Sequence, residues 1–345
     1  MTSMERVLTA LSHREPDRVP LFLLLTMHGA RELGLSIERY FSDHEHVVKG
    51  QLSMLKRYGH DCIYSFFHAS LEAEAWGGCT LFSDDGPPNA GAPPIRDPET
   101  IGTLAPPRVL DSPGLVRVLK AQEGLRQAVG DSVPIVGVVM APFSLPVMQL
   151  GVEAYLDLMF ERPELMQRLM ELNSAFCSEW ANAQLAAGAH AICCFDPLAS
   201  PRMISPDLYR CTGHPAASET MARIGAPTAT HLASGPCLGT VDDLVSTGTA
   251  MVGVGGEEDL AEIKEACRGR LTVLGNLNGV RMRSWDEETA IAAVRSAIWQ
   301  GAPGGGFILS DQHGEIPWQV PERTLQLIAD TARGYGRYPL PGGRG

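Results

Sequence analysis

The sequence lacks a long hydrophobic run, a cysteine framework and a secretion signal. It contains no stretch of about 18 consecutive apolar residues, which excludes a typical transmembrane helix. The eight cysteines are scattered without C-x-x-C spacing, so this chain of 345 residues is not built on disulfides. The residues after Met1 show no charged segment followed by an apolar one, and no secretory signal is expected. These absences predict a reduced, cytoplasmic compartment and no membrane partner.

Positive charge is also scarce. The chain has 28 Lys and Arg residues against 40 Asp and Glu, which gives a formal net charge of −12. A surface of this sign repels phosphate backbones, so nucleic-acid binding is not expected. The P-loop of nucleotide-binding proteins and the G-x-S-x-G elbow of hydrolases are also missing. The glycines of Gly253-Val-Gly-Gly256 do not complete a G-x-G-x-x-G pattern, and a dinucleotide site is rejected.

What the sequence does contain is eight short apolar runs that alternate with helical patterns. Such alternation is typical of βα units around a parallel sheet, and eight units predict an α/β protein with a closed (β/α)8 TIM barrel. We expect one barrel domain over residues 1–345. The eight predicted strands are residues 19–25, 61–67, 133–140, 190–195, 227–232, 250–255, 271–275 and 306–310.

One region does not follow the alternation. Residues 83–107 are rich in Pro, Gly and Asp, and an irregular stretch of this length inside a compact domain is usually functional or an added decoration. We interpret it as an insertion after the second strand. Two longer segments, 37–59 and 152–187, carry the spacing of amphipathic helices.

Polar residues follow most of the predicted strands. In a (β/α)8 barrel the carboxyl ends of the strands build the active site, so this placement predicts an enzyme without naming its reaction. Asp196, His231 and His313 are the predicted catalytic residues, because each follows a strand where a carboxylate or imidazole can move a proton or bind a metal. The predicted substrate-binding residues are His28, Arg31, His68, Asn276, Asn278, Asp311 and Gln312.

At these positions the sequence resembles the uroporphyrinogen decarboxylase superfamily, which also contains the methylcobamide:coenzyme M methyltransferases. The resemblance covers nearly the whole chain and implies the barrel fold. The segments that carry it best are Arg14-Glu-Pro-Asp-Arg-Val-Pro20, Ser70-Leu-Glu-Ala-Glu-Ala-Trp-Gly77, Ala141-Pro-Phe143, Asp196-Pro-Leu-Ala-Ser-Pro201, the strand end at His231, Gly275-Asn276 and Gly306-Phe-Ile-Leu-Ser310.

The decarboxylase branch of the superfamily is similar only in part. Its members have an M-R-Q-A-G-R segment whose arginines hold the carboxylates of a tetrapyrrole. This chain has Met27-His28-Gly29-Ala30-Arg31 there, with one arginine missing and a shorter spacing. Eight carboxylates call for dense cationic donors, which are not evident at the strand ends. The step His313-Gly314 is the one feature that resembles this branch more closely.

The methyltransferase branch implies a zinc ion held by an H-x-C pair and a second cysteine. His231 matches the histidine, but Ala233 stands where the first cysteine belongs and His313 where the second belongs. A thiolate-rich zinc site is therefore not expected. A divalent metal held by harder ligands remains open, with His231, His313 and Asp196 as the ligand set and Cys194 as a further donor. A metal-free acid–base site is the alternative.

The sequence therefore favours a corrinoid-linked methyltransferase, which moves a methyl group between a cobalamin and a small acceptor or donor. The cobalamin would be free or carried by a small corrinoid protein. A decarboxylase acting on uroporphyrinogen or another carboxylate is the second hypothesis. A non-catalytic corrinoid- or tetrapyrrole-binding protein is the third. A homodimer is compatible with the sequence.

Overall fold

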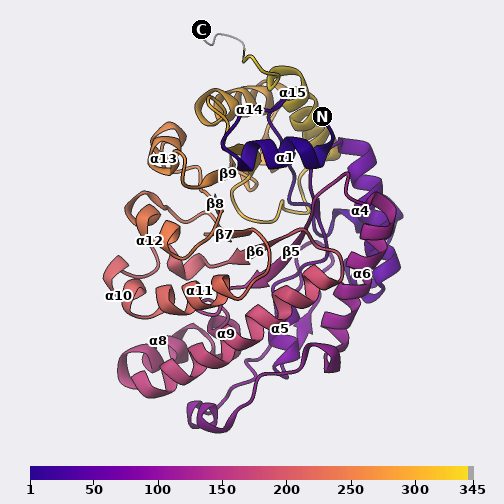
Figure 1. The fold of residues 1–345 in the computed structure, drawn as a ribbon. Coiled ribbons are helices and arrows are strands. Elements are labelled where there is room, and N and C mark those ends of the chain that lie inside the picture. The colour runs from indigo at the N-terminus through magenta and orange to yellow at the C-terminus, as the bar shows by residue number, and fades with distance from the viewer. Residues whose placement is uncertain (341–345) are drawn as a thin grey trace.

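The computed structural model describes residues 1–340 and contains one parallel eight-stranded sheet, which curves into a nearly closed barrel (Figure 1). The predicted (β/α)8 barrel is confirmed. The strand order is β1-β10-β9-β8-β7-β6-β5-β2. The strands are β1 (Leu21–Phe22), β2 (Ile63–Tyr64), β5 (Ile135–Met140), β6 (Ala191–Phe195), β7 (Thr228–His231), β8 (Met251–Gly253), β9 (Thr272–Leu277) and β10 (Phe307–Asp311).

Helices surround the barrel and pack on the outward-facing side chains of its strands. The longer helices of this layer are α4 (His44–Tyr58), α6 (Pro113–Val129), α8 (Val152–Glu161), α9 (Pro163–Ala186), α11 (Gly213–Ala222), α13 (Leu260–Cys267), α14 (Glu287–Gly301) and α15 (Glu322–Tyr335). The shorter ones are α2 (His28–Leu33), α3 (Ile37–Ser42), α5 (Ser70–Ala75), α7 (Pro146–Leu150), α10 (Pro206–Cys211) and α12 (Val241–Ser246). In residues 1–340 no helix combines the length and the apolar character needed to cross a bilayer.

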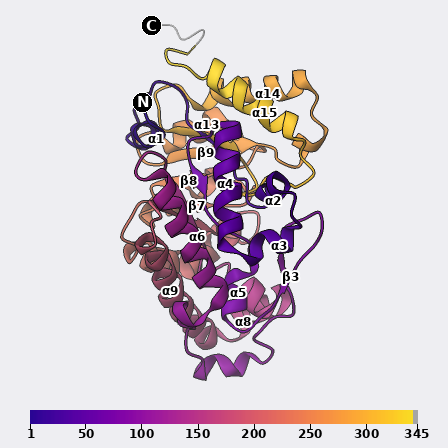
Figure 2. The ribbon, with the colours of Figure 1, turned by 90° about the vertical axis from the view of Figure 1, so that its right-hand side faces the viewer.

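Helix α1 (Ser3–Leu11) covers the N-terminal end of the barrel. Thr2 and Glu5 form a capping box at its start, which satisfies two backbone N–H groups. Its apolar side chains Met4, Val7 and Leu11 line a small apolar space at this end, of about 70 Å³. Figure 2 shows α1 on the left and α2 and α3 on the right, so the carboxyl ends of the strands face away from α1.

Both long helical patterns are interrupted in the structure. Residues 37–59 form α3 and α4, because the Asp43 side chain accepts the N–H of Glu45 and caps a new helix. Residues 152–187 form α8 and α9, which are separated at Arg162 by the following Pro163. A proline has no N–H to continue the first helix but fits the first turn of the second.

The insertion after the second strand is present as predicted, with some regular structure of its own. A short antiparallel hairpin pairs β3 (Thr80–Leu81) with β4 (Asn89–Ala90), and residues Pro98–Thr103 form a 3-10 helix. Strands β1 and β2 are shorter than predicted, with two residues each. The remaining residues of their apolar runs are buried but leave the ladder as they turn into the loops of the barrel rim.

The barrel closes between β1 and β2 through Asp61. Its backbone N–H donates to the carbonyl of Leu21 (2.6 Å), and its carboxylate accepts the N–H of the same residue (2.8 Å). The carboxylate also binds the guanidinium groups of Arg6 and Arg18, each at 2.7 Å. Asp61 is fully buried. Because both of its oxygens are paired with cations and N–H groups, burial of the charge is compensated.

Replacing Asp61 with Asn tests this closure. The variant removes the carboxylate partner of the Arg18 guanidinium and one of the two carboxylate partners of buried Arg6, which also pairs with Asp17, so we expect it to lower the free energy of unfolding by about 3 kcal/mol. Urea unfolding followed by circular dichroism measures the change. The exposed pair Arg268–Glu265 provides the control, since Glu265→Gln should cost less than about 0.5 kcal/mol. A loss below about 1 kcal/mol in Asp61→Asn would contradict the proposed closure.

Candidate functional site at the carboxyl end of the barrel

Two of the predicted catalytic residues meet at the carboxyl end of the barrel. His231 is the last residue of β7, and His313 follows β10. They are joined by Ser234, whose hydroxyl contacts Nδ1 of His313, and by Gly314, whose backbone lies against the imidazole of His231. Strand ends about 80 residues apart in the sequence are thus brought together, as the barrel topology predicts.

The imidazole of His231 is fully buried and uncharged. Its Nδ1 accepts the N–H of Ala233 (3.1 Å), and its ring stacks on Phe195 with centroids 4.7 Å apart. A Cβ at Gly253 would collide with this ring, so glycine is required beside it. Burial, and secondarily the nearby His313, lower the pKa of His231 to about 3. Its Nε2 has no hydrogen-bond partner within the described residues and is left to a ligand or water.

His313 is held in one tautomer by a chain of hydrogen bonds. The Gly256 N–H donates to Oε1 of Gln312 (2.7 Å), which orients the Gln312 amide so that its Nε2 donates to Nε2 of His313 (3.2 Å). The other imidazole nitrogen, Nδ1, is therefore protonated and donates to Ser234. The Ser234 hydroxyl in turn donates to the carbonyl of Gln312 (3.4 Å). Both nitrogens of His313 are engaged by protein atoms.

Two carboxyl groups lie at the base of the β10 loop, that of buried Asp311 and that of half-buried Glu315. One oxygen of Asp311 accepts the N–H groups of His313 (2.8 Å) and Gly314 (3.1 Å), and the other has no partner in the part of the chain described. Burial raises the pKa of Asp311 to about 7. Burial and the charge of Asp311 raise the pKa of Glu315 to about 8. Near neutral pH, Glu315 is therefore mostly protonated and Asp311 is divided between its protonated and ionised forms. The buried hydroxyl of Tyr64, from β2, also lacks a partner among these residues.

Asp196 is at the same end of the barrel but does not join the two histidines. Ser144, which follows β5, donates its hydroxyl to the Asp196 carboxylate (2.6 Å). Burial raises the pKa of Asp196 to about 7. Phe195 and Cys193 face the barrel interior, so Asp196 and Cys194 alternate to the helix-facing side. The side chain of Asp196 therefore supports the wall of the barrel.

His28 and Arg31, on α2, contact the loop that follows β10. The guanidinium of Arg31 donates to the carbonyl groups of Trp318 and Val320 and lies 4.2 Å above the Trp318 ring. His28 is buried beside the same indole, and burial lowers its pKa to about 3. Arg31 thus fastens the loop that carries His313, and its donors are directed at the main chain rather than at a substrate carboxylate.

His68 lies apart from the His231–His313 pair. It is buried at the end of the β2 run among the rings of Phe41, Phe66 and Phe82. Its Nδ1 contacts the hydroxyl of Ser70 (2.9 Å). The rings come from α3, from the loop after β2 and from the insertion, so three segments of the chain enclose this imidazole.

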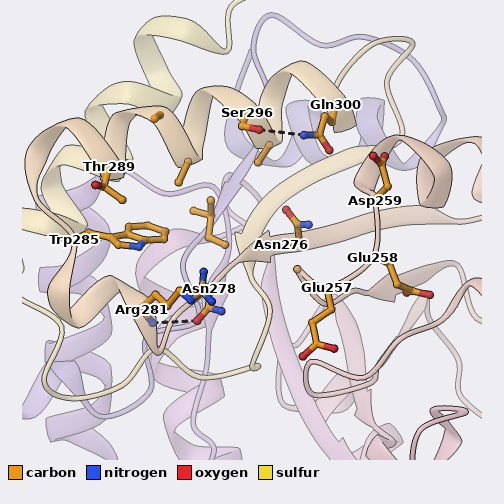
Figure 3. A pocket seen from close by; sticks show the side chains of 15 residues that line it. Glu257, Glu258, Asp259, Asn276, Asn278, Arg281, Trp285, Thr289, Ser296 and Gln300 are labelled. Atoms are coloured by element: carbon orange, nitrogen blue, oxygen red, sulfur yellow. Dashed lines mark hydrogen bonds between the residues drawn. The ribbon is translucent and has the colours of Figure 1, made fainter.

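A groove of about 780 Å³ adjoins the histidine network (Figure 3). Asn276 and Asn278, at the end of β9, face it together with Arg281 and Trp285, and α14 forms its opposite wall. Oδ1 of Asn278 accepts the N–H of Arg281 (3.0 Å) and lies 3.5 Å from Nε2 of His313. The groove and the histidine network therefore share Asn278. Both asparagines are placed where the sequence predicts a substrate-orienting role.

The predicted metal ligands do not form a metal site. Within residues 1–340, no group of three or more His, Cys, Asp or Glu side chains is arranged to hold an ion. The physical reasons are visible at each residue. Both nitrogens of His313 are engaged in hydrogen bonds, and Asp196 accepts the Ser144 hydroxyl on the other side of the strand. The neighbouring Cys194 shares that outward face by alternation. The zinc implied by the resemblance does not fit these side chains.

Two residues of the site were not predicted from the sequence. Ser234 belongs to the turn after β7, where a serine is ordinarily a turn residue. It adopts a positive φ of 74°, which directs its hydroxyl toward His313. Tyr64 looked like an ordinary apolar strand residue. Its inward direction depends on which face of β2 lines the barrel, which alternation alone does not decide.

The depressed pKa of His231 predicts a pH-dependent stability. Its pKa is about 3 when folded, against an ordinary value of 6.5, so the unfolded chain binds a proton first as the pH falls. The stabilisation is complete above pH 6.5 and is lost progressively toward pH 3. Between pH 6.5 and 5 this single group should cost about 2 kcal/mol.

Urea unfolding of wild type and His231→Gln at pH 7, 6 and 5 measures this contribution. The variant should lose less stability than wild type over this range, by the stated amount. Equal pH dependence in the two proteins would show that His231 titrates normally in the folded state.

Known proteins resemble the chain along its whole length. The model of the family described as uroporphyrinogen decarboxylase (URO-D) matches residues 2–335. The chain is 25% identical over 287 residues to the methylcobamide:CoM methyltransferase MtaA of Methanosarcina barkeri, covering 80% of this chain and 83% of that protein. It is 24% identical over 358 residues to the uroporphyrinogen decarboxylase of Xylella fastidiosa, covering 96% and 99%.

The fold is shared with a solved methyltransferase from Methanosarcina mazei. The two superpose with a TM-score of 0.87 at 21% sequence identity, over 96% of this chain and 98% of the other. The family match and the shared fold each cover nearly the whole chain. The chain belongs to the uroporphyrinogen decarboxylase (URO-D) family.

Proposed function

We propose that this protein is a corrinoid-linked methyltransferase that moves a methyl group between a cobalamin and a small, weakly charged molecule. The observation that carries the proposal is the uncharged character of the site. His231 is neutral, His313 is held in a neutral tautomer, Glu315 is mostly protonated near neutral pH, and Asp311 is only partly ionised there. Such a set hydrogen-bonds a small neutral group and offers little to a polyanion.

The same observation argues against uroporphyrinogen as substrate. Recognition of many carboxylates needs cationic donors directed at the ligand. In the described part of the chain, Arg31 is directed at main-chain carbonyls, Arg202 pairs with Glu257 at the rim, and Arg281 supplies a single cation to the groove, beside Glu257, Glu258 and Asp259. The net charge of −12 adds long-range repulsion of a polycarboxylate.

In this proposal the histidines and amides orient the small molecule. Because Nδ1 of neutral His231 accepts the Ala233 N–H, its Nε2 carries the hydrogen and donates it to an oxygen, nitrogen or sulfur atom of the small molecule, and Asn278 and Asn276 hold that molecule toward the groove. Asp311 exchanges the proton that methyl transfer releases or consumes, because a pKa of about 7 matches the working pH. Asp196 does not touch the small molecule in this proposal; its bond to Ser144 supports the wall of the barrel. The corrinoid is a substrate that covers the mouth of the barrel.

No step of this proposal uses zinc, because the residues at the expected ligand positions do not form a zinc site. The two thiolates that would hold and activate a thiol are replaced by Ala233 and His313. The polarity of the site must therefore come from fixed hydrogen bonds.

An anaerobic assay with methylcobalamin and a panel of small thiols, alcohols and amines tests the proposal through the visible absorbance of the corrinoid. Methyl transfer should survive exhaustive chelation. His231→Ala and His313→Ala should each lower kcat/KM by about 10² to 10⁴-fold. His214→Ala on α11, where the imidazole bonds the hydroxyl of Ser246, is the matched control and should change little.

Three outcomes would contradict the proposal. Efficient conversion of uroporphyrinogen to coproporphyrinogen by the same preparation would favour a decarboxylase. Loss of methyl transfer on chelation, restored by zinc, would mean that a metal completes the site. Corrinoid binding without turnover of any methyl acceptor or donor would favour a non-catalytic binding protein.

A further inference from the structure

A chain of hydrogen bonds leads from buried His68 to the protein surface. Nδ1 of His68 lies 2.9 Å from the Ser70 hydroxyl, and this hydroxyl lies 3.0 Å from that of Thr80. The Thr80 hydroxyl donates to the carboxylate of Glu74 (2.8 Å), which is exposed. Ser70 and Glu74 belong to α5, and Thr80 comes from the hairpin of the insertion. This series of hydrogen bonds therefore ends at Glu74 in solvent and at His68 in the interior.

The direction of every bond in this chain follows from its surface end. A carboxylate only accepts hydrogen bonds, so Thr80 donates its single hydroxyl hydrogen to Glu74. The Thr80 oxygen must then accept a hydrogen bond from the Ser70 hydroxyl, which donates its only hydrogen to Thr80. The Ser70 oxygen is left to accept from His68, and Nδ1 of His68 must carry a hydrogen.

The opposite nitrogen of His68 is consequently a hydrogen-bond acceptor. The side chain is only 3% exposed, and the rings of Phe41, Phe66 and Phe82 surround it, so charged ligands are disfavoured there. Burial, and secondarily the charge of Arg117, lower the pKa of His68 to about 3, which agrees with a neutral imidazole.

We propose that Ser70, Thr80 and Glu74 form a directional relay that fixes His68 as the Nδ1–H tautomer and presents its Nε2 lone pair to the O–H or S–H group of a small neutral ligand. His68 lies apart from the His231–His313 pair, so this ligand site is separate from the one proposed for the methyl acceptor, and neither the ligand site nor the fixed tautomer rests on the proposed function. Ser70, Thr80 and Glu74 are positioning residues in this account, because they act through His68.

The relay also lets a weakly basic histidine accept a proton. When the ligand's X–H bond breaks, the electron pair stays on X and the proton goes to Nε2 of His68. The Nδ1 hydrogen passes to Ser70, the Ser70 hydrogen to Thr80, and the Thr80 hydrogen to Glu74. The imidazole ends neutral, so the charge that burial disfavours is never stored on it.

The tautomer is measurable without any activity. The ten histidines can be labelled with nitrogen-15, and two-bond proton–nitrogen correlations distinguish the two neutral tautomers. His68→Gln identifies the signal of His68 by its disappearance. In wild type we expect a protonated Nδ1 and an unprotonated Nε2 at neutral pH.

Thr80→Val removes the hydroxyl at nearly constant shape and should release the tautomer, moving both nitrogen shifts toward their average. Thr80→Ser restores the hydroxyl and should restore the wild-type signals. Thr220→Val is the control, because the Thr220 hydroxyl is buried without a partner within residues 1–340 and far from the relay in sequence. It should leave His68 unchanged.

An Nε2–H tautomer in wild type would overturn the proposal. So would identical His68 shifts in wild type and Thr80→Val. Neither result depends on methyl transfer. If the tautomer is fixed as expected and no methyl acceptor is ever found, the proposed function fails while the relay stands.

Discussion

The whole arrangement depends on closing the barrel between its first two strands. Strands β1 and β2 have only two residues each, so they contribute few ladder bonds of their own. Asp61 replaces the missing ladder with a backbone bond, a side-chain bond to the same residue, and ion pairs with buried Arg6 and half-buried Arg18. Only a closed barrel places the end of β7 beside the end of β10, with Ser234 touching His313. The ion pairs of Asp61, which close the barrel, therefore support the positions of His231 and His313 at the carboxyl ends of the strands.

At the carboxyl end, the dominant physical effect is desolvation. Burial lowers the pKa of His231 and raises the pKa values of Asp311 and Glu315, and all three changes remove charge. The result is a rim of neutral donors and acceptors with several unpartnered atoms. A family that includes both decarboxylases and methyltransferases shares the fold, so the chemistry must follow from such local differences.

Much of the fold and part of the site follow from the sequence. Eight apolar runs with polar residues at their ends predict the barrel and the meeting of His231 with His313. Alternation also places Asp196 and Cys194 on one face of β6. It does not say which face is inward, and the structure turns that face toward Ser144 and the helices. The direction of Arg31 toward main-chain carbonyls depends on how the β10 loop returns to α2, which no local pattern encodes. The same holds for Thr80, whose contact with Ser70 exists only because the hairpin of the insertion folds back over α5.

The central claim is that this rim selects a corrinoid and a small neutral partner over a polycarboxylated tetrapyrrole. Equilibrium dialysis of the purified protein against methylcobalamin, and separately against uroporphyrin, tests it most directly through the visible absorbance of each compound. The account predicts saturable binding of methylcobalamin and no saturable binding of uroporphyrin at physiological ionic strength. Saturable binding of uroporphyrin without binding of methylcobalamin would contradict it.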